Sequence, residues 1–228
     1  MNFSFDQILI VGDTHAQYSR LFEELDRFSL TNTLLIHVGD GGEGFLPHKK
    51  QLRQFELLNN SFKKRGVEYW SIRGNHSDPA YFDGSVNLSN FKLLPDYHTA
   101  IINNQKFQFV GGAISIDRIW RKEGVSYWKD EPFVFDETKA EKCDVLITHS
   151  SPTWNGPIEK SVFIERRKLE DVELSKDMFN ERNDHDKLIA ACSPKKHYCG
   201  HFHKSYYSEY AGCISKILAE LEIIEYIN

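Results

Sequence analysis

The chain has 228 residues, of which 40% are hydrophobic and 27% are charged, and its formal net charge is −5. This length and composition are typical of a globular protein with a sizeable core, and we expect a single domain over residues 1–228. The negative net charge argues against a surface built to coat nucleic acid, for which a basic stripe is typical.

The first third of the chain alternates between apolar strands and amphipathic helices. We expect buried strands at 8–11, 33–38 and 67–72, and helices at 18–28 and 48–64, whose apolar residues recur at helical spacing. Strand-helix-strand-helix-strand order predicts a parallel sheet with right-handed crossovers.

The remainder of the chain is richer in short β runs. Residues 97–102 and 106–110 predict a hairpin that turns at Asn103 and Asn104, whereas 114–135 has no regular pattern. We expect the later elements to be a helix over 136–142, a strand over 145–148, a helix over 186–192, and strands over 196–199, 206–210, 214–218 and 221–227. Residues 152–186 are polar with mixed charge, which predicts either a flap or a helical excursion.

Five of the apolar runs are followed by side chains that can bind a metal ion. These side chains are Asp13 and His15, Asp40, Asn75 and His76, His149, and His201 with His203. A glycine precedes the first ligand in four of the five motifs, and glycine lets the backbone turn sharply and approach a site closely. Because ligands bind beyond the carboxyl ends of strands in open α/β sheets, we expect these side chains to converge.

This set of side chains is too large for one tetrahedral ion. It fits two ions about 3.5–4 Å apart that share one carboxylate and a water or hydroxide, and Asp40 is the natural bridge. Mixed histidine, aspartate and asparagine ligation favours manganese, iron or zinc over magnesium or calcium. Two such cations lower the pKa of the bridging water and neutralise charge on phosphate oxygens.

The order Asp-x-His, Gly-Asp, Gly-Asn-His, His and Gly-His-x-His, between Gly12 and His203, resembles the calcineurin-like metallophosphoesterase superfamily. The resemblance implies an α/β fold, an α+β sandwich of two mixed β-sheets flanked by helices, with the site at the C-terminal ends of strands. It also implies a phosphoesterase with two divalent metal ions, in which a metal-bridging hydroxide attacks phosphorus.

The resemblance further implies a role for each motif residue. One metal would be held by Asp13, His15, Asp40 and His203, and the other by Asp40, Asn75, His149 and His201. His76 would not ligate a metal, but would contact the scissile phosphate and protonate the leaving oxygen, with Asn75 and the two ions stabilising the charge.

Two positions depart from the Ser/Thr protein phosphatases. Those enzymes carry Asp-Arg-Gly after the second motif, but residues 43–45 here are Glu-Gly-Phe, so the phosphate-clamping arginine is absent. They also carry an acidic residue directly after Gly-Asn-His, whereas Ser77 precedes Asp78 here. The group that orients His76 is therefore open. The segment 111–128 resembles uncharacterised bacterial and phage members of the superfamily.

Three arginines are candidates for contacts with the substrate phosphate, namely Arg73, Arg118 and Arg121. Each offers the planar fork that binds phosphate through two hydrogen bonds. The alternative for each is a solvated charge or a pair with a local carboxylate.

The N-terminal residues 1–6 resemble no secretory signal, and no segment approaches the ~20 apolar residues of a membrane span. The four cysteines form no Cys-x-x-Cys pair, so we expect reduced thiols, a cytoplasmic protein and no membrane partner. Cys199, next to a ligand motif, is either a ligand or, as we favour, a small buried hydrophobe.

The function that these motifs predict is hydrolysis of a phosphomonoester, with a phosphoprotein, nucleotide or nucleic acid as the substrate. One alternative is a phosphodiesterase or nuclease with the same metal pair. An alternative of another class is an inactive scaffold, like the retromer-type subunit of the superfamily. The complete ligand set together with His76 favours an enzyme.

Overall fold

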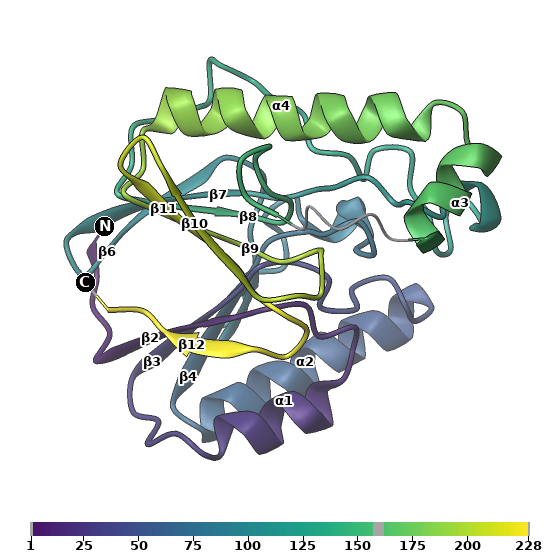
Figure 1. Ribbon diagram of the computed structural model, residues 1–228. Coiled ribbons are helices and arrows are strands. Elements are labelled where there is room, and N and C mark those ends of the chain that lie inside the picture. Colours follow the sequence, from purple (N-terminus) through teal and green to yellow (C-terminus); the bar gives the residue numbers. More distant parts are fainter. Residues whose placement is uncertain (1, 157–161, 228) are drawn as a thin grey trace.

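Two mixed β-sheets lie face to face in the computed structural model, which describes residues 2–156 and 162–227 (Figure 1). Helices α1 and α2 cover the outer face of one sheet, and α4 covers the outer face of the other. The predicted fold class, two mixed sheets flanked by helices, is thereby confirmed. Within the described residues, no helix has both the length and the apolar character needed to cross a membrane.

The five-stranded sheet contains the three parallel strands predicted near the N-terminus. Its order is β12 (Ile223–Glu225), β2 (Gln7–Val11), β3 (Thr33–His37), β4 (Val67–Ser71) and β5 (Phe91–Leu93), with only β12 antiparallel to its neighbour. The crossovers are α1 (Tyr18–Leu25) and α2 (His48–Lys64). Helix α1 ends before residue 28 because Arg27 and Phe28 bond to carbonyls three residues back, which tightens the chain into a turn.

The seven-stranded sheet is built largely from the second half of the chain. Its order is β1 (Asn2–Phe3), β6 (His98–Ile102), β7 (Gln105–Val110), β8 (Val145–Thr148), β9 (Lys196–Cys199), β11 (Cys213–Ile217) and β10 (Tyr206–Tyr210). The predicted hairpin is confirmed as β6–β7. Its turn residues Asn103 and Asn104 have φ of 47° and 64°, which asparagine tolerates in two-residue hairpin turns.

The segment between β8 and β9 is a helical excursion in its described part. Helix α3 spans Val162–Glu170 and α4 spans Leu174–Cys192, so the helix predicted over 186–192 is only the last part of α4. Leu188, Ile189 and Cys192 pack on the seven-stranded sheet. Residues 157–161 of this segment lie outside the described residues.

The helix predicted over 136–142 is wrong. Asp136 Oδ1 accepts hydrogen bonds from the backbone N–H and the hydroxyl of Thr138, which favours a turn over a helix. The Gln108 side-chain amide then donates to the carbonyl of Lys139 and accepts from the N–H of Glu141, so the segment runs along β7. Two short 3-10 helices, Pro79–Tyr81 and Arg118–Trp120, complete the described elements.

The apolar core has two main layers because residues on a strand point alternately to opposite faces. In β2, Ile8 and Ile10 face the space between the sheets, while Leu9 and Val11 face α1 and α2. A strand buried on both faces is apolar throughout, which explains the uninterrupted apolar run of the sequence. This rigid double-sided packing fixes the points at which the ligand-bearing loops begin.

Candidate metal centre

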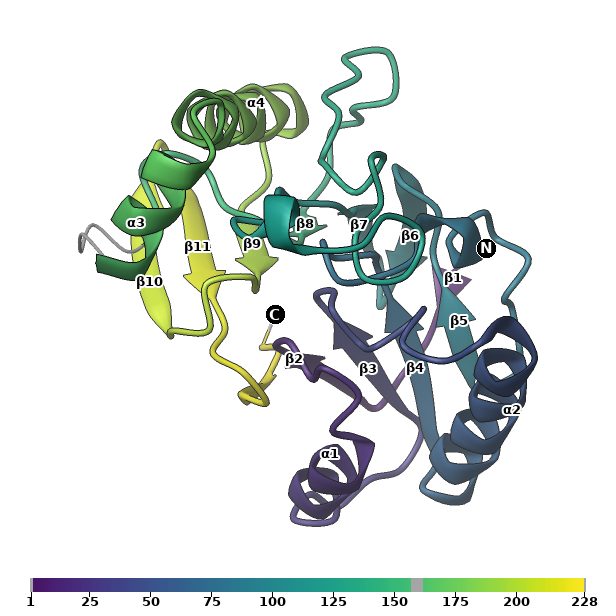
Figure 2. The ribbon, with the colours of Figure 1, turned by 90° about the vertical axis from the view of Figure 1, so that its right-hand side faces the viewer.

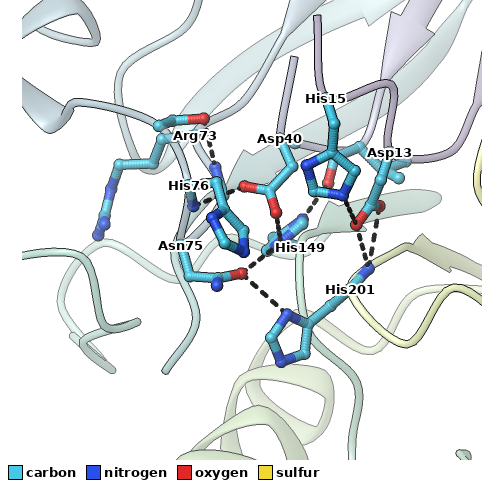
Figure 3. Close-up of polar contacts among 12 residues, drawn as sticks. Asp13, His15, Asp40, Arg73, Asn75, His76, His149 and His201 are labelled. Atoms are coloured by element: carbon cyan, nitrogen blue, oxygen red, sulfur yellow. Dashed lines mark hydrogen bonds and ion pairs between the residues drawn. The ribbon is translucent and has the colours of Figure 1, made fainter. Parts of the chain in front are cut away.

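All seven predicted metal ligands lie together, beyond the C-terminal ends of five parallel strands. The ends of β2, β3, β8 and β9 lie near one another in Figure 2, and the loop that follows β4 joins them. The loops after these five strands supply Asp13 and His15, Asp40, Asn75 and His76, His149, and His201 with His203. Figure 3 shows most of these side chains pointing toward one another.

One cluster consists of Asp13, His15 and His203. Asp13 Oδ2 lies 3.1 Å from His203 Nε2 and 3.9 Å from His15 Nε2, and the two Nε2 atoms are 3.0 Å apart. Asp13 is buried, whereas the His203 side chain is 45% exposed, so this cluster opens to solvent. One carboxylate oxygen and two imidazole nitrogens form a donor set suited to a divalent transition metal.

The second cluster lies deeper, around His149. His149 Nε2 is 3.5 Å from Asp40 Oδ2 and 3.1 Å from Asn75 Oδ1, and His201 Nδ1 is 2.9 Å from the same Asn75 oxygen. Asp13 also reaches this cluster, since ligand atoms of Asp13, Asp40 and His149 lie within 4.8 Å of one another.

In this second cluster, nitrogen and oxygen lone pairs face one another without a hydrogen between them, an arrangement that favours binding of a cation. His149 Nδ1 lies 2.7 Å from the carbonyl oxygen of Val38, which can only accept, so Nδ1 carries the hydrogen. His149 Nε2 then faces two oxygen acceptors. In the described part of the chain, the buried Asp40 Oδ2 accepts no hydrogen bond. A buried carboxylate oxygen without a donor is costly unless it coordinates a metal. The residues present therefore fit a metal-binding site.

Burial and charge shape the protonation of the cluster. Burial lowers the pKa of His149, but the carboxylates of Asp40 and Asp13 outweigh it and raise the value to about 9. Burial raises the pKa of Asp40, yet His149 holds it well below its usual range. Burial, together with the charge of His149, lowers the pKa of His201 to about 3. Both carboxylates are therefore ionised at neutral pH, and a divalent ion would take the place of the His149 proton.

Asn75 is oriented by side chains that do not themselves reach the centre. Its Nδ2 donates to Ser115 Oγ at 3.0 Å, which turns Oδ1 toward His149 and His201. The Ser115 backbone N–H in turn donates to the buried Glu131 Oε1 at 2.8 Å. Ser115 and Glu131 were not among the predicted site residues. Such partners of a ligand fix its orientation and tune metal affinity.

The predicted close approach of glycine backbones to the site is confirmed at two positions. A Cβ atom on Gly74 would lie 2.0 Å from Asp40 Oδ1, and one on Gly200 would lie 2.1 Å from Asp13 Oδ1. Backbone N–H groups that follow these glycines, those of His76 and His201, donate to the same carboxylates at 2.8 and 3.0 Å. The motif glycines thus let one loop press against the carboxylate of another.

Several ligands occupy the left-handed region of backbone conformation. The φ angles are 45° for His15, 63° for Asp40, 70° for His201 and 54° for His203. Each costs roughly 1–2 kcal/mol for a residue with a Cβ atom. Strained backbone of this kind persists where the surrounding structure fixes it, and it clusters at functional sites.

The loop that carries Asp13 is also clamped by the C-terminal part of the chain. The Gly12 N–H donates to the carbonyl of Glu222 at 3.0 Å, and the Leu221 N–H donates to the carbonyl of Asp13 at 2.9 Å. Strand β12 then pairs with β2 directly below this loop. The first ligand is therefore positioned from two sides.

His76 belongs to neither ligand cluster and lies instead beside Arg121. The Arg121 Nη1 and Nη2 atoms lie 2.5 Å and 3.0 Å from the two ring nitrogens of His76. Asp117 holds Arg121 from the other side, with Oδ1 2.5 Å from Nε. Burial and the charge of Arg121 together hold the pKa of His76 below its usual value. Arg121 is thus the residue that faces and orients the His76 ring.

The other two arginines proposed for phosphate contact serve the structure of the protein. The buried Arg73 binds the Asp96 carboxylate at 2.8 Å and the carbonyls of residues 130–132. Arg118 binds Asp171 at 2.6 Å and Asp177 at 2.7 Å. Neither Arg73 nor Arg118 lines the cavity beside the metal centre, whereas Arg121 does, so of the three candidates the structure places Arg121 at the centre.

Glu43, at a position where Ser/Thr phosphatases carry Asp-Arg-Gly, is buried beneath the centre. It accepts a hydrogen bond from the Ser77 hydroxyl at 3.0 Å, and Ser77 Oγ accepts one from the Gly74 N–H at 3.1 Å. Burial raises the pKa of Glu43 to about 7. This chain of contacts supports the loop that carries Asn75 and does not contact the His76 ring.

Comparison with known proteins identifies the family of this chain. The sequence model of the family described as calcineurin-like phosphoesterase matches residues 7–205. Among solved structures, a protein serine/threonine phosphatase from Saccharomyces cerevisiae, similar to human phosphatase PP5, aligns with a TM-score of 0.40 and 13% sequence identity, over 96% of this chain and 70% of the other. A comparison with curated protein sequences gave no match. Because the family match covers most of the chain and contains every candidate ligand, the chain belongs to the calcineurin-like phosphoesterase family.

Proposed function

We propose that this protein is a phosphomonoesterase with two divalent metal ions. Membership of the family supports a metal-dependent hydrolase of phosphate esters. The observation that carries the proposal is that Asp13 belongs to two groups of potential ligands, one with His15 and His203 and one with Asp40 and His149, and that the buried Asp40 Oδ2 accepts no hydrogen bond in the described part of the chain. Protons alone would leave some of these buried lone pairs without a partner, whereas two cations could bind them.

The two proposed ligand sets share Asp40. As the family resemblance implies, one would consist of Asp13, His15, Asp40 and His203, and the other of Asp40, Asn75, His149 and His201. The described contacts join Asp13 to His15 and His203, and Asp40 to His149. When bound, the two ions would supply an activated water and would neutralise charge on the phosphate. The mixture of nitrogen and oxygen donors supports manganese, iron or zinc, and we propose manganese as the first metal to test.

The side chains outside the ligand sets would bind the phosphate and assist the leaving group. Arg121 presents its guanidinium beside the centre, and the ion pair with Asp117 keeps it there. Its Nη2 atom, which has a second hydrogen besides the one that faces His76, would bind a phosphate oxygen and so take the place of the arginine missing at residues 43–45. The pKa of His76 lies below its usual value here, and the negative charge of a bound phosphate would raise it, so that His76 would hold a proton next to the leaving oxygen and give it up as the ester bond breaks. A monoester dianion offers Arg121 more charge than a diester, which supports the monoester.

The first experiment combines metal analysis with turnover of two nitrophenyl esters. Elemental analysis of protein purified without chelator should give about two metal ions per chain. With manganese added, p-nitrophenyl phosphate should be hydrolysed faster than bis(p-nitrophenyl) phosphate, and EDTA should abolish both reactions. Faster hydrolysis of the diester would favour the phosphodiesterase alternative. Protein that takes up metal but hydrolyses neither ester would favour the scaffold, and protein that binds no metal would refute the proposal.

Two substitutions separate the proposed roles of His76 and Asp40. His76→Ala should leave the metal content intact and lower turnover by ~10²-fold or more, because only proton donation is lost. Asp40→Ala should empty or disorder both metal sites. His48, which contacts Tyr81 away from the centre, provides the control, and His48→Ala should change neither metal content nor turnover. Loss of metal in His76→Ala would refute the role assigned to His76.

We also propose that the protein acts in the cytoplasm. All four of its cysteines are free, three of them buried, which supports a reducing compartment. Cys199 is buried on β9, and the described metal clusters do not include it. This supports its reading as a small core residue.

A further inference from the structure

A cavity of about 750 Å³ adjoins the metal centre. Asp40, Asn75, His201 and His203 line one end of it, so the cavity opens directly from the atoms that would bind the phosphate. The other end extends toward α3 and α4, which lie together on one side of the centre in Figure 2. The volume is that of a pocket for a small molecule, for which 300–1,000 Å³ is usual.

The wall away from the metal ligands contains six apolar side chains among charged ones, which include Glu165, Lys168 and Arg182. Its apolar side chains are Ile114, Ile116, Phe163, Ile164, Met178 and Phe202. They come from four segments distant in the sequence, the loop after β7, α3, α4 and the loop after β9. An apolar surface inside a polar catalytic cleft is costly to leave in water, and it marks the place where an apolar part of a ligand binds.

Aromatic side chains line the cavity from the candidate metal ligands outward. The Phe202 ring packs edge-on against the ring of His201, with centroids 5.0 Å apart. The guanidinium of Arg182 lies 5.8 Å from the centroid of the same Phe202 ring. Phe163, half-exposed on α3, and Met178 on α4 face the cavity from the other side. Aromatic rings and a thioether are good partners for a flat ring placed between them.

We propose that this cavity binds the leaving group of a small phosphomonoester, and that this group carries a flat, largely apolar ring of nucleoside size. The inference rests on the phosphoesterase function proposed above. A phosphate held at Arg121 and the metal ligands would place such a ring against Phe202, Phe163 and Met178. A phosphorylated serine or threonine side chain carries no ring that could lie against this wall.

The test compares two substrates with the same kind of ester bond. Adenosine 5′-monophosphate and glycerol 3-phosphate are both primary alkyl phosphates, and only the former carries a ring. With manganese present, kcat/KM should be at least about 5-fold higher for the nucleotide, since stacking of one base contributes ~1–3 kcal/mol. A phosphoserine peptide should behave like glycerol 3-phosphate.

Two neighbouring variants on α4 test whether the cavity causes the preference for the nucleotide over glycerol 3-phosphate. Met178→Ala should lower kcat/KM for the nucleotide about 5- to 10-fold and leave glycerol 3-phosphate unchanged. Phe179→Ala removes a larger side chain at the next position, which is exposed and does not line the cavity, and it should change neither value. Phe163→Ala provides a second, independent removal from the wall.

The outcomes distinguish this inference from the function on which it rests. Equal kcat/KM for the two alkyl phosphates, or a preference for the phosphopeptide, would overturn the ring-binding cavity while leaving a working phosphoesterase. A nucleotide preference that survives both Met178→Ala and Phe163→Ala would also overturn it. Failure to hydrolyse any of the esters in the presence of metal would refute the proposed function and this inference with it.

Discussion

Glu181 provides a quantitative test of the packing between α4 and the candidate site. Its side chain is buried, and its Oε1 accepts a hydrogen bond from the Ile114 N–H at 3.1 Å. Burial raises the pKa of Glu181 from 4.5 to about 8, against the opposing effect of His149. The folded protein therefore keeps a proton on this carboxyl at neutral pH, whereas the unfolded chain releases it.

The sign of the effect on stability follows from this difference. The folded-state pKa lies above the unfolded value, so the contribution of Glu181 is fully present below pH 4.5 and is lost as the pH rises through 8. A difference of one pH unit between the two pKa values corresponds to 1.36 kcal/mol, so the shift sets an upper bound of about 5 kcal/mol on the free energy of unfolding that is lost. Glu181→Gln keeps an acceptor for Ile114 and removes the titration.

Urea unfolding of metal-free protein at pH 5, 6.5 and 8 measures this contribution. Relative to the wild type, the free energy of unfolding of Glu181→Gln should rise by several kcal/mol between pH 5 and pH 8. Glu173→Gln makes the same chemical change at an exposed position before α4, and it should follow the wild type. If the profiles of Glu181→Gln and the wild type ran parallel, the burial argument would be refuted.

Three further substitutions test other contacts. Ser115→Ala should weaken manganese binding ~10- to 100-fold by releasing the Asn75 amide, as measured by equilibrium dialysis, and unchanged affinity would contradict the orienting role. Asp96→Asn should lower the free energy of unfolding by about 2–3 kcal/mol because the buried Arg73 loses its carboxylate, and a smaller change in urea unfolding would show that the carbonyls suffice. Phe62→Ala should cost about 3–5 kcal/mol in the same assay, because it opens a cavity beside Tyr69.

The metal centre could be predicted from the sequence because each of its parts is local. At Gly39 and Asp40, for example, the apolar strand, the glycine that ends it and the ligand are adjacent in the chain. Parallel strands end at the same edge of a sheet, which brings together the ends of β2, β3 and β4 in one sheet and of β8 and β9 in the other. That the two edges also meet depends on how the sheets face each other. The five motifs therefore predicted that these candidate ligands lie at strand ends, and the structure brings them together.

Features that depend on distant partners could not be predicted in this way. The ion pair between Arg73 and Asp96 joins residues 23 positions apart, and that between Arg118 and Asp171 joins residues 53 positions apart. The sequence near each arginine therefore gives no sign of its partner. Ser115 lies 40 positions from the Asn75 amide that it orients.

Helix α4 was also under-predicted for a physical reason. Its buried face includes Glu181 and His185 as well as Leu188, so the apolar periodicity is interrupted. Tertiary burial of polar side chains, which the helical pattern does not report, extends the helix over residues 174–185.

The C-terminal clamp on the Asp13 loop has a consequence for the order of biosynthesis. All seven candidate ligands have been synthesised once His203 has been added, but the Glu222 and Leu221 backbone groups that hold Gly12 and Asp13 follow later. Strand β12 joins the sheet only after them. A nascent chain that has just completed its candidate ligands therefore still lacks the backbone contacts that fix the first of them.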